Sequence, residues 1–305
     1  MTFQLYTKIR PLGSEENAGI FENASDTIIV EEKIDGANFR FMITEDNRII
    51  FGSRTQSIGD SEQQIGGNWE KCVEHIKKTL KGKDLSEYKG LIFYGECCIK
   101  HTLQYDWSSI PPFLGYDIFD IKDNKYLDYP VNKIIFNLLG LEFVPVIKEC
   151  SAGEIGEIND SIVPPTKYPS PSAGANDLQA EGIVYKNYDK QIFGKYVLDK
   201  FKEKAREVFG GSPKFAKDDT ERVVLTYCVN ARIEKIIFKL IDDGHKLDMP
   251  LMHHAPVAVL NDIFEEAGKE IFMSKLTVNF GEVRQRVSKR VLEVLKNMIA
   301  NNLRR

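Results

Sequence analysis

The chain has 305 residues, of which 42% are hydrophobic and 28% are charged, and its formal net charge is −4. This is ordinary globular composition, and the length is enough for two domains with a substantial core. No apolar run approaches the ~20 residues that a membrane-spanning helix needs, so we expect no membrane association.

The cysteine pattern bears on the compartment. The chain has five cysteines, and Cys97 and Cys98 are adjacent, which does not make a disulfide framework. The first residues carry neither a secretory nor a transit pattern. We therefore expect a reducing, cytoplasmic location.

Charge is distributed unevenly along the chain. Residues 213–305 hold 16 Lys and Arg against 13 Asp and Glu, and the remainder holds 25 against 32. An acidic body with a mildly basic tail fits metal binding in one part and polyanion contact in the other. Solvated helix faces would give the same pattern.

The apolar periodicity predicts strands first and helices later. Residues 28–43 predict two short strands with a tight turn at Asp35-Gly36. In chain order we then expect a strand at 48–51, a helix at 68–81, strands at 90–98 and 113–121, a helix at 131–139, a strand at 143–147, a long surface loop at 151–180, strands at 180–186 and 192–198, a linker at 210–213, and helices at 218–243, 256–271 and 282–303.

This order predicts an α+β architecture with two domains. The first would cover residues 1–210 and hold the strands. The second, residues 213–305, would be all-helical.

Lys33 sits near a strand end beside the turn, which allows two interpretations. The ordinary one is a solvated charge. The other is a nucleophile. An amine attacks only after it has lost its proton, and the pKa of a free lysine is ~10.4. A nearby cation or a desolvated pocket lowers that pKa.

Glu96 lies inside an apolar strand, where a carboxylate is costly unless it is paired or metal-bound. An ion pair with Arg54 would satisfy it. Alternatively, Glu96 and Glu181 would together hold a divalent metal beside Lys33. The sequence lacks a Walker lysine loop, G-x-G-x-x-G, H-E-x-x-H and paired C-x-x-C motifs.

The charged residues follow one another in a specific order of short motifs. These are Lys33-Ile34-Asp35-Gly36, Ser53-Arg54, Tyr94-Gly95-Glu96, Phe119-Asp120-Ile121, Glu181-Gly182-Ile183-Val184 and Lys195. The order resembles the lysyl-adenylate nucleotidyltransferases, and most closely the ATP-dependent RNA ligases of the bacteriophage RNA ligase 2-like group. The motifs that carry the resemblance lie within roughly residues 1–205. The tail resembles the group only in being helical.

The resemblance implies a nucleotidyltransferase domain of ATP-grasp-like antiparallel sheets, followed by the helical domain. It implies that Lys33 carries AMP, with ATP and Mg²⁺ or Mn²⁺ as cofactors. The further roles it implies are adenine stacking for Phe119, metal binding for Glu96 and Glu181, phosphate contacts for Lys186 and Lys195, positioning of the phosphate or RNA end for Asn38 and Arg54, and lining of the adenine site for Glu32.

Some positions depart from the pattern or fit a structural role as well. The group shows Lys-x-Lys in its last motif, whereas Lys195-Tyr196-Val197 supplies only the first lysine unless Lys200 or Lys202 reaches in. Asp35 differs from the His of the namesake, although Asp is commoner across the wider family. Phe119, in an aromatic strand, also suits a core.

From the resemblance we expect an ATP-dependent RNA ligase that joins RNA ends carrying a 3′-hydroxyl and a 5′-phosphate. A DNA ligase or an mRNA capping guanylyltransferase is the first alternative, but these append a strand-rich OB barrel where this tail is helical. A non-catalytic RNA-binding module is the second, and the intact Lys33, Glu96 and Glu181 disfavour it.

Overall fold

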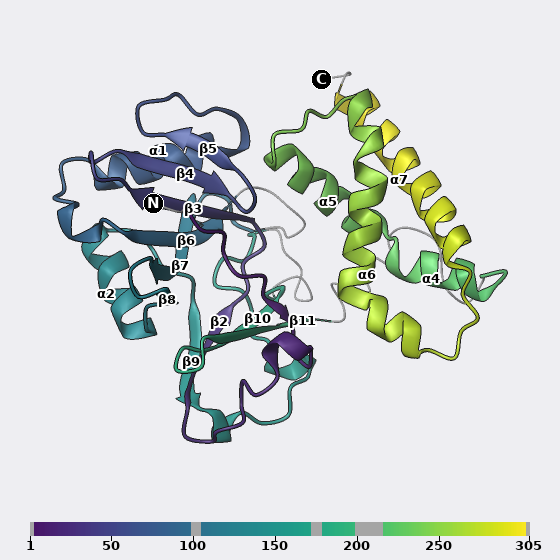
Figure 1. Cartoon of the computed structure of the whole chain (residues 1–305), viewed down its shortest axis with the longest axis horizontal. Helices are drawn as coiled ribbons and strands as arrows, with labels where there is room; N and C mark the ends of the chain where they lie inside the picture. The colour runs from purple at the N-terminus through teal and green to yellow at the C-terminus, as the bar shows by residue number, and fades with distance from the viewer. Residues whose placement is uncertain (1–2, 99–104, 172–178, 199–215, 303–305) are drawn as a thin grey trace. The chain divides into compact units, whose positions relative to one another are not determined.

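The structure is a computed structural model of the chain, and it describes residues 3–98, 105–171, 179–198 and 216–302. The chain divides into two compact units, Met1–Leu198 and Asp199–Arg305 (Figure 1). The first unit holds two β-sheets and the second is helical, which confirms the expected α+β architecture. The linker expected at 210–213 lies outside the described residues.

One sheet of the first unit has five strands, in the order β1-β11-β10-β2-β9. β1 runs parallel to β11, and the other neighbouring pairs are antiparallel. The strands are β1 Arg10–Pro11, β2 Thr27–Glu32, β9 Val146–Ser151, β10 Gly182–Asn187 and β11 Ile192–Val197.

The other sheet has six strands, in the order β5-β4-β3-β6-β7-β8, and all its pairs are antiparallel. The strands are β3 Ala37–Ile43, β4 Ile49–Ser53, β5 Ser57–Asp60, β6 Leu91–Cys97, β7 Phe113–Asp120 and β8 Lys125–Tyr126.

The segment around Lys33 crosses from one sheet to the other. β2 pairs with β9 and β10, whereas β3 pairs with β4 and β6. The two predicted strands therefore form, as β2 and β3, but they lie in different sheets and do not pair with each other across Asp35-Gly36. A turn dipeptide predicts only a local bend. Which strands pair with each other depends on side-chain packing with distant segments. The crossing places Lys33 between the two sheets.

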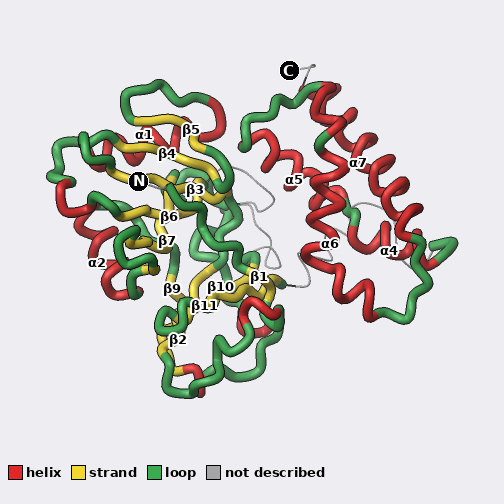
Figure 2. Tube along the Cα trace, in the orientation of Figure 1, coloured by secondary structure: helices red, strands yellow, loops and turns green. Residues whose placement is uncertain are grey.

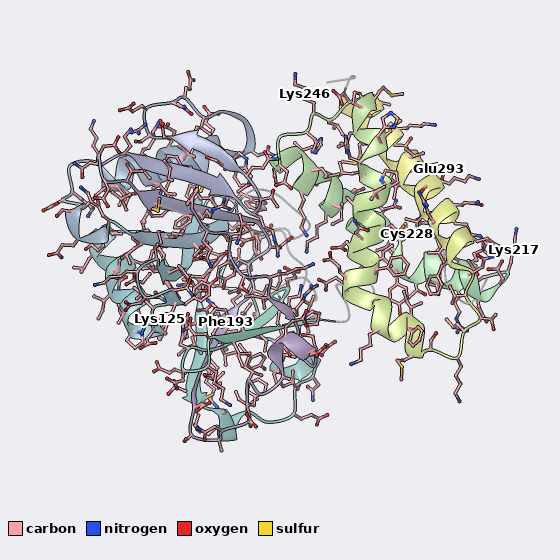
Figure 3. The ribbon with its side chains drawn as sticks, in the orientation of Figure 1. Lys125, Phe193, Lys217, Cys228, Lys246 and Glu293 are labelled. Atoms are coloured by element: carbon pink, nitrogen blue, oxygen red, sulfur yellow. The ribbon has the colours of Figure 1, made fainter. Side chains whose placement is uncertain are left out.

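Two hydrophobic clusters hold the first unit together. The inner cluster draws side chains from both sheets, including Phe193 of β11 (Figure 3) and Met42 of β3, so it lies between them. The outer cluster covers the opposite face of the six-stranded sheet, where Phe41 and Phe93 stack 4.6 Å apart. Helices α1 (Glu70–Leu80) and α2 (Tyr129–Leu139) pack on that outer face.

The helix expected at 68–81 is confirmed as a 3-10 turn, Gly67–Trp69, that leads into α1. Its apolar face, formed by Trp69, Val73, Ile76 and Leu80, is buried. α2 ends at Gly140, whose φ of 70° is the left-handed conformation that closes many helices. The predicted strand at 143–147 instead forms at β9, Val146–Ser151.

The described part of the second unit contains helices and no strands, as Figure 2 makes plain. The helix expected at 218–243 is broken between α4 and α5, so that prediction is wrong in detail. Cys228 and Val229 lie between the two helices and are not helical. They are 0% and 9% exposed, so the break is buried in the core, which the apolar periodicity of the sequence does not reveal. The helices are α4 Asp219–Tyr227, α5 Asn230–Asp242, α6 Ala255–Met273 and α7 Phe280–Asn302.

The core of the second unit joins all four helices. An apolar stripe of α7 faces this core, since Val283, Val287, Val291 and Leu295 are at most 2% exposed. Among the described residues, no helix is both long and apolar enough to cross a membrane.

Candidate active site

Lys33 meets Glu181 where β2 and β10 end side by side. Its main-chain N–H donates to the carbonyl of Gly182 at 3.0 Å, which continues the pairing of the two strands. Its Nζ donates to Glu181 Oε2 at 2.5 Å. The side chains are 20% and 11% exposed, so a partly open ion pair joins residues from two motifs that lie far apart in the sequence.

Gly36 brings the crossing segment against Glu96. Its N–H donates to Glu96 Oε1 at 3.1 Å. A Cβ at this position would lie 2.5 Å from the carbonyl oxygen of Cys97 and 2.8 Å from Glu96 Cγ, which is closer than carbon can approach. The position therefore requires glycine, and Glu96 is held by the backbone as well as by its own strand.

Asp35, next to it, is 4% exposed. Its N–H donates to the hydroxyl of Tyr105 at 2.8 Å. Tyr105 comes from a segment far along the chain, so the crossing stretch is anchored on both sides of its turn.

Asn38 and Glu96 are direct partners across β3 and β6, so their side chains share one face of the sheet. The Asn38 amide donates to the hydroxyl of Tyr116 on β7. Burial raises the pKa of Tyr116 well above its ordinary value; the nearby Glu96 raises it further and Arg54 lowers it. Asn38, Glu96 and Arg54 therefore lie near the hydroxyl of Tyr116.

Tyr116 is a site candidate that the sequence analysis missed. It opens Tyr116-Asp117-Ile118, directly before the triplet Phe119-Asp120-Ile121 that we singled out. Phe119 lies in the inner cluster, 4% exposed, with its ring 5.2 Å from that of Tyr126. The aromatic ring beside Asn38 and Glu96 is therefore that of Tyr116. The repeated aromatic-Asp-Ile pattern was the available signal.

Lys186 is enclosed by acids, which differs from the phosphate contact expected of it. Its side chain is 1% exposed, and its Nζ lies 2.7 Å from Glu31 Oε2 and 2.8 Å from Asp117 Oδ2. It also donates to the carbonyl of Tyr116 at 3.1 Å. Lys186 thus connects β2 and β10 of one sheet with β7 of the other.

The acids of this cluster were not predicted from the sequence. Asp117 accepts two further hydrogen bonds, from the hydroxyls of Tyr6 and Tyr188, both at 2.5 Å. Glu31 Oε1 is buried and has no hydrogen-bond partner among the described residues. Burial and Asp117 raise the pKa of Glu31 to about 7, although Lys186 lowers it.

Glu32, expected in the adenine site, ties β2 to the long loop at 151–180. Its carboxylate accepts from the hydroxyl of Thr166 and, at 3.1 Å, from the N–H of Lys167. Burial raises its pKa, and these hydrogen bonds partly offset the effect. The loop therefore contributes contacts beside the nucleophile.

Lys195 lies on β11 directly opposite Val184, which in turn pairs with Glu31. Paired residues project from the same face, so Lys195 lies on the site-facing side of the five-stranded sheet. Its side chain is half-buried. Lys200 and Lys202, weighed as a second lysine, lie outside the described residues.

Comparison with known proteins shows the family and the fold of the chain. Residues 26–202 match the family model described as RNA ligase. A variant of the Naegleria gruberi RNA ligase with ATP and Mn is similar in fold, with 20% identity and a TM-score of 0.52 over 67% of this chain and 58% of that one. Another variant of the same ligase, with AMP and Mn, is 20% identical, with a TM-score of 0.51 over 67% of this chain and 59% of that one.

A curated relative covers a smaller part. The protein Early 65 kDa of Autographa californica nuclear polyhedrosis virus is 27% identical over 149 residues, which are 48% of this chain and 24% of that protein. The chain thus spans under two thirds of the length of these relatives. The family model nevertheless matches more than half of the chain and includes Lys33, Glu96, Glu181 and Lys195. The chain belongs to the RNA ligase family.

Proposed function

We propose that the protein is an ATP-dependent RNA ligase that joins a 3′-hydroxyl to a 5′-phosphate through a lysyl-AMP intermediate on Lys33. The contact between Lys33 and Glu181 carries the proposal. It unites the expected nucleophile with an acid from a distant motif at a partly open position between two sheets. The likeness to structures of an RNA ligase with ATP or AMP supports it.

Three phosphoryl transfers make up the reaction. The Lys33 amine attacks the α-phosphorus of ATP, the bond to pyrophosphate breaks, and the amine loses a proton. An oxygen of the RNA 5′-phosphate then attacks the same phosphorus and releases Lys33. Last, the 3′-hydroxyl attacks the activated 5′-phosphorus, loses its proton and expels AMP.

The resting ion pair has a consequence for the first step. An ammonium has no lone pair to donate, so Lys33 must lose its proton and separate from Glu181 before it attacks. Glu181 lies within reach of that proton.

Tyr116 is the residue that we assign to the adenine face, in place of Phe119. Both rings belong to the inner cluster, but the Tyr116 hydroxyl accepts from Asn38 and lies near Glu96 and Arg54, whereas the Phe119 ring packs against Tyr126. Aromatic stacking on a base contributes about 1–3 kcal/mol. The Arg54 side chain makes no ion pair among the described residues, which suits a contact with phosphate.

Glu96 and Glu181 would hold the divalent cation. Glu96 Oε1 accepts from the Gly36 N–H and Glu181 Oε2 accepts from Lys33, and the described residues hold no group of three metal-binding side chains. Mg²⁺ in phosphoryl-transfer sites is often held by one or two carboxylates with substrate phosphates and water, so the pair fits. When bound, Mg²⁺ or Mn²⁺ would neutralise charge on the phosphates.

The two lysines of the last motifs take different roles in this proposal. Lys195, half-buried on the site-facing side, would contact phosphate. Lys186, held by Glu31 and Asp117, would position Tyr116 through its bond to the Tyr116 carbonyl. The helical unit would hold the RNA ends.

The test is a covalent adduct. Incubation with ATP and Mg²⁺ should add the mass of AMP to the intact chain, and Lys33→Ala should abolish the adduct, whereas Lys148→Ala, an exposed control on β9, should not. Glu181→Ala should slow adenylation at least ~100-fold, the effect of removing one transition-state charge interaction.

Strand joining should then require a 5′-phosphate, with a 5′-hydroxyl RNA as the negative control. An adduct that forms from GTP in preference to ATP would favour a capping enzyme. An adduct that persists in Lys33→Ala would place the nucleophile elsewhere.

A further inference from the structure

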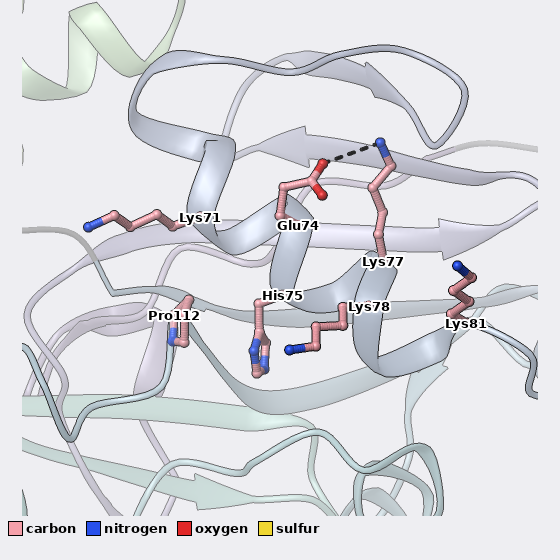
Figure 4. Close-up of a pocket in the computed structure, with 7 residues that line it drawn as sticks. All are labelled: Lys71, Glu74, His75, Lys77, Lys78, Lys81 and Pro112. Carbon is pink, nitrogen blue, oxygen red and sulfur yellow. Dashed lines mark ion pairs between the residues drawn. The ribbon is translucent and has the colours of Figure 1, made fainter.

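Helix α1 lies on the outer face of the six-stranded sheet, where it lines a hollow of about 550 Å³ (Figure 4). The apolar residues of α1 are buried beneath it, so the polar face of the helix forms the wall. The lining residues are Lys71, Glu74, His75, Lys77, Lys78, Lys81 and Pro112.

The charge in this hollow is mostly unneutralised. Its one acid, Glu74, lies 3.6 Å from Lys77, which also donates to the carbonyl of Gln63 at 3.1 Å. Lys71, Lys78 and Lys81 are exposed and form no ion pair with the described residues. Three free ammonium groups on one wall favour an anionic partner.

His75 adds a polar group between these lysines. Its Nε2 is buried and has no hydrogen-bond partner among the described residues. Burial lowers the pKa of the imidazole, Lys78 lowers it further, and Glu142 opposes them. The ring is therefore neutral near pH 7, so the positive charge of the hollow comes from its lysines.

The hollow begins directly behind the candidate active site. Glu96 projects toward the site, and the next residue, Cys97, belongs to the outer cluster and contacts the Asn68 carbonyl at 3.9 Å, just before α1. The Pro112 carbonyl accepts from Cys98 N–H at 3.0 Å. The end of β6 that carries Glu96 therefore lies next to the Lys71 end of the helix.

We propose that Lys71, Lys78 and Lys81 form an anchoring surface for the phosphate backbone of RNA, beyond the ends that are joined. The inference rests on the proposed function, because it takes RNA as the polyanion. At 1.5 Å per residue, Lys71 and Lys81 are separated by about 15 Å along the helix, enough to meet several phosphates of one strand. Lysine contacts phosphate as a point charge, so the surface reads no sequence.

The experiment compares two triple variants of the full-length protein. The test variant is K71A/K78A/K81A. The control is K122A/K125A/K148A, which removes the same charge from exposed positions of the same unit outside the hollow. Both keep all the residues assigned to the nucleotide site, and both should form lysyl-AMP at the wild-type rate.

RNA affinity is then measured across a salt series. The test variant should bind a long RNA about tenfold more weakly, and the slope of log affinity against log salt should become shallower by about 0.7–0.9 for each phosphate that the variant no longer binds. The control should stay within about twofold. On an RNA too short to reach α1, the test variant should match the wild type.

The anchoring role would be contradicted if the two triple variants bound long RNA with equal affinity. It would also be contradicted if the test variant lost the same affinity for short RNA as for long RNA. These outcomes leave the proposed ligase intact as long as the wild type forms lysyl-AMP and joins RNA. A wild-type protein that adenylates but binds no RNA would overturn both the surface and the RNA substrate.

Discussion

The Nζ of Lys186 lies 2.7 Å from Oε2 of Glu31, and the two side chains are only 1% and 3% exposed. Asp117 shares the same ammonium, so two carboxylates face one buried cation. The cluster has one negative charge too many when both acids are ionised. Burial of Glu31 and, to a smaller extent, the neighbouring Asp117 raise the pKa of Glu31 to about 7, and a proton on Glu31 removes that excess.

The first prediction concerns stability against pH. Because the folded-state pKa of Glu31 is about 7 and the ordinary value is 4.5, the folded protein binds this proton more tightly than the unfolded chain. The contribution is therefore fully present below pH 4.5 and is lost as the pH rises through 7. In Glu31→Gln this pH dependence should disappear, so the variant should gain in unfolding free energy relative to the wild type at pH 8.5, but not at pH 4.5.

Denaturant unfolding at the two pH values measures the effect. Glu149→Gln, at an exposed position on the neighbouring strand β9, is the matched control and should follow the wild type. If Glu31→Gln and the wild type lose the same stability between pH 4.5 and 8.5, the buried proton is not on Glu31.

The second prediction concerns Gly36. A methyl group there would overlap the carbonyl of Cys97 at 2.5 Å, so Gly36→Ala must displace either the crossing segment or the end of β6. Both changes move Glu96 relative to Lys33. Adenylation should fall by at least about 100-fold, in line with the sensitivity of such reactions to small misplacements.

Gly66→Ala is the control for that substitution. No atom lies within 4 Å of a Cβ at Gly66, and its φ of −105° suits any residue. The control should keep full adenylation. A Gly36→Ala protein that adenylates normally would mean that the Gly36–Glu96 contact does not position the site.

Several features of the site were predictable because they depend on local sequence. The Lys33 and Glu181 motifs appear as short patterns with strand and turn signals around them. The contact between them was not predictable from spacing, because it depends on β2 and β10 becoming neighbours. The same limit applies to the crossing at Asp35-Gly36, whose bend is local and whose strand partners are not.

The choice between Phe119 and Tyr116 depends on a feature of sheet register. β6 and β7 pair Tyr94 with Asp117 but Gly95 with Gly115, so Tyr116 is the extra residue of a bulge. A bulge changes which side chains face the site, and alternation along the strand does not reveal it. The acids on Lys186 were missed for a related reason, since a lysine at a strand end gives no sign in the sequence of being buried.

The third prediction separates these two aromatic residues. Tyr116→Leu should raise the KM for ATP in the adenylation step by at least about fivefold, because a stacking contact contributes about 1–3 kcal/mol. Phe119→Leu should leave that KM near the wild-type value but lower the free energy of unfolding, since Phe119 is 4% exposed in the inner cluster. Tyr116→Phe should retain most nucleotide affinity.

ATP titration of adenylation gives the KM of each leucine variant, and denaturant unfolding gives its free energy of unfolding. The opposite result, in which Phe119→Leu weakens ATP and Tyr116→Leu affects only unfolding, would return the adenine contact to Phe119.

The last prediction concerns the helical unit. Residues 213–305 have three more basic than acidic residues, and the buried stripe of α7 leaves Arg284 and Lys289 outside the core. A truncated protein ending at Gly211 keeps all of the assigned site residues, so it should still form lysyl-AMP. It should lose strand joining, because the helical unit would no longer hold the RNA ends. For the intact protein, RNA affinity should fall steeply with salt, since each phosphate contact releases counterions. Mass measurement of the adduct confirms that the truncated protein is folded and active, and sealing by it at the intact rate would remove the helical unit from the mechanism.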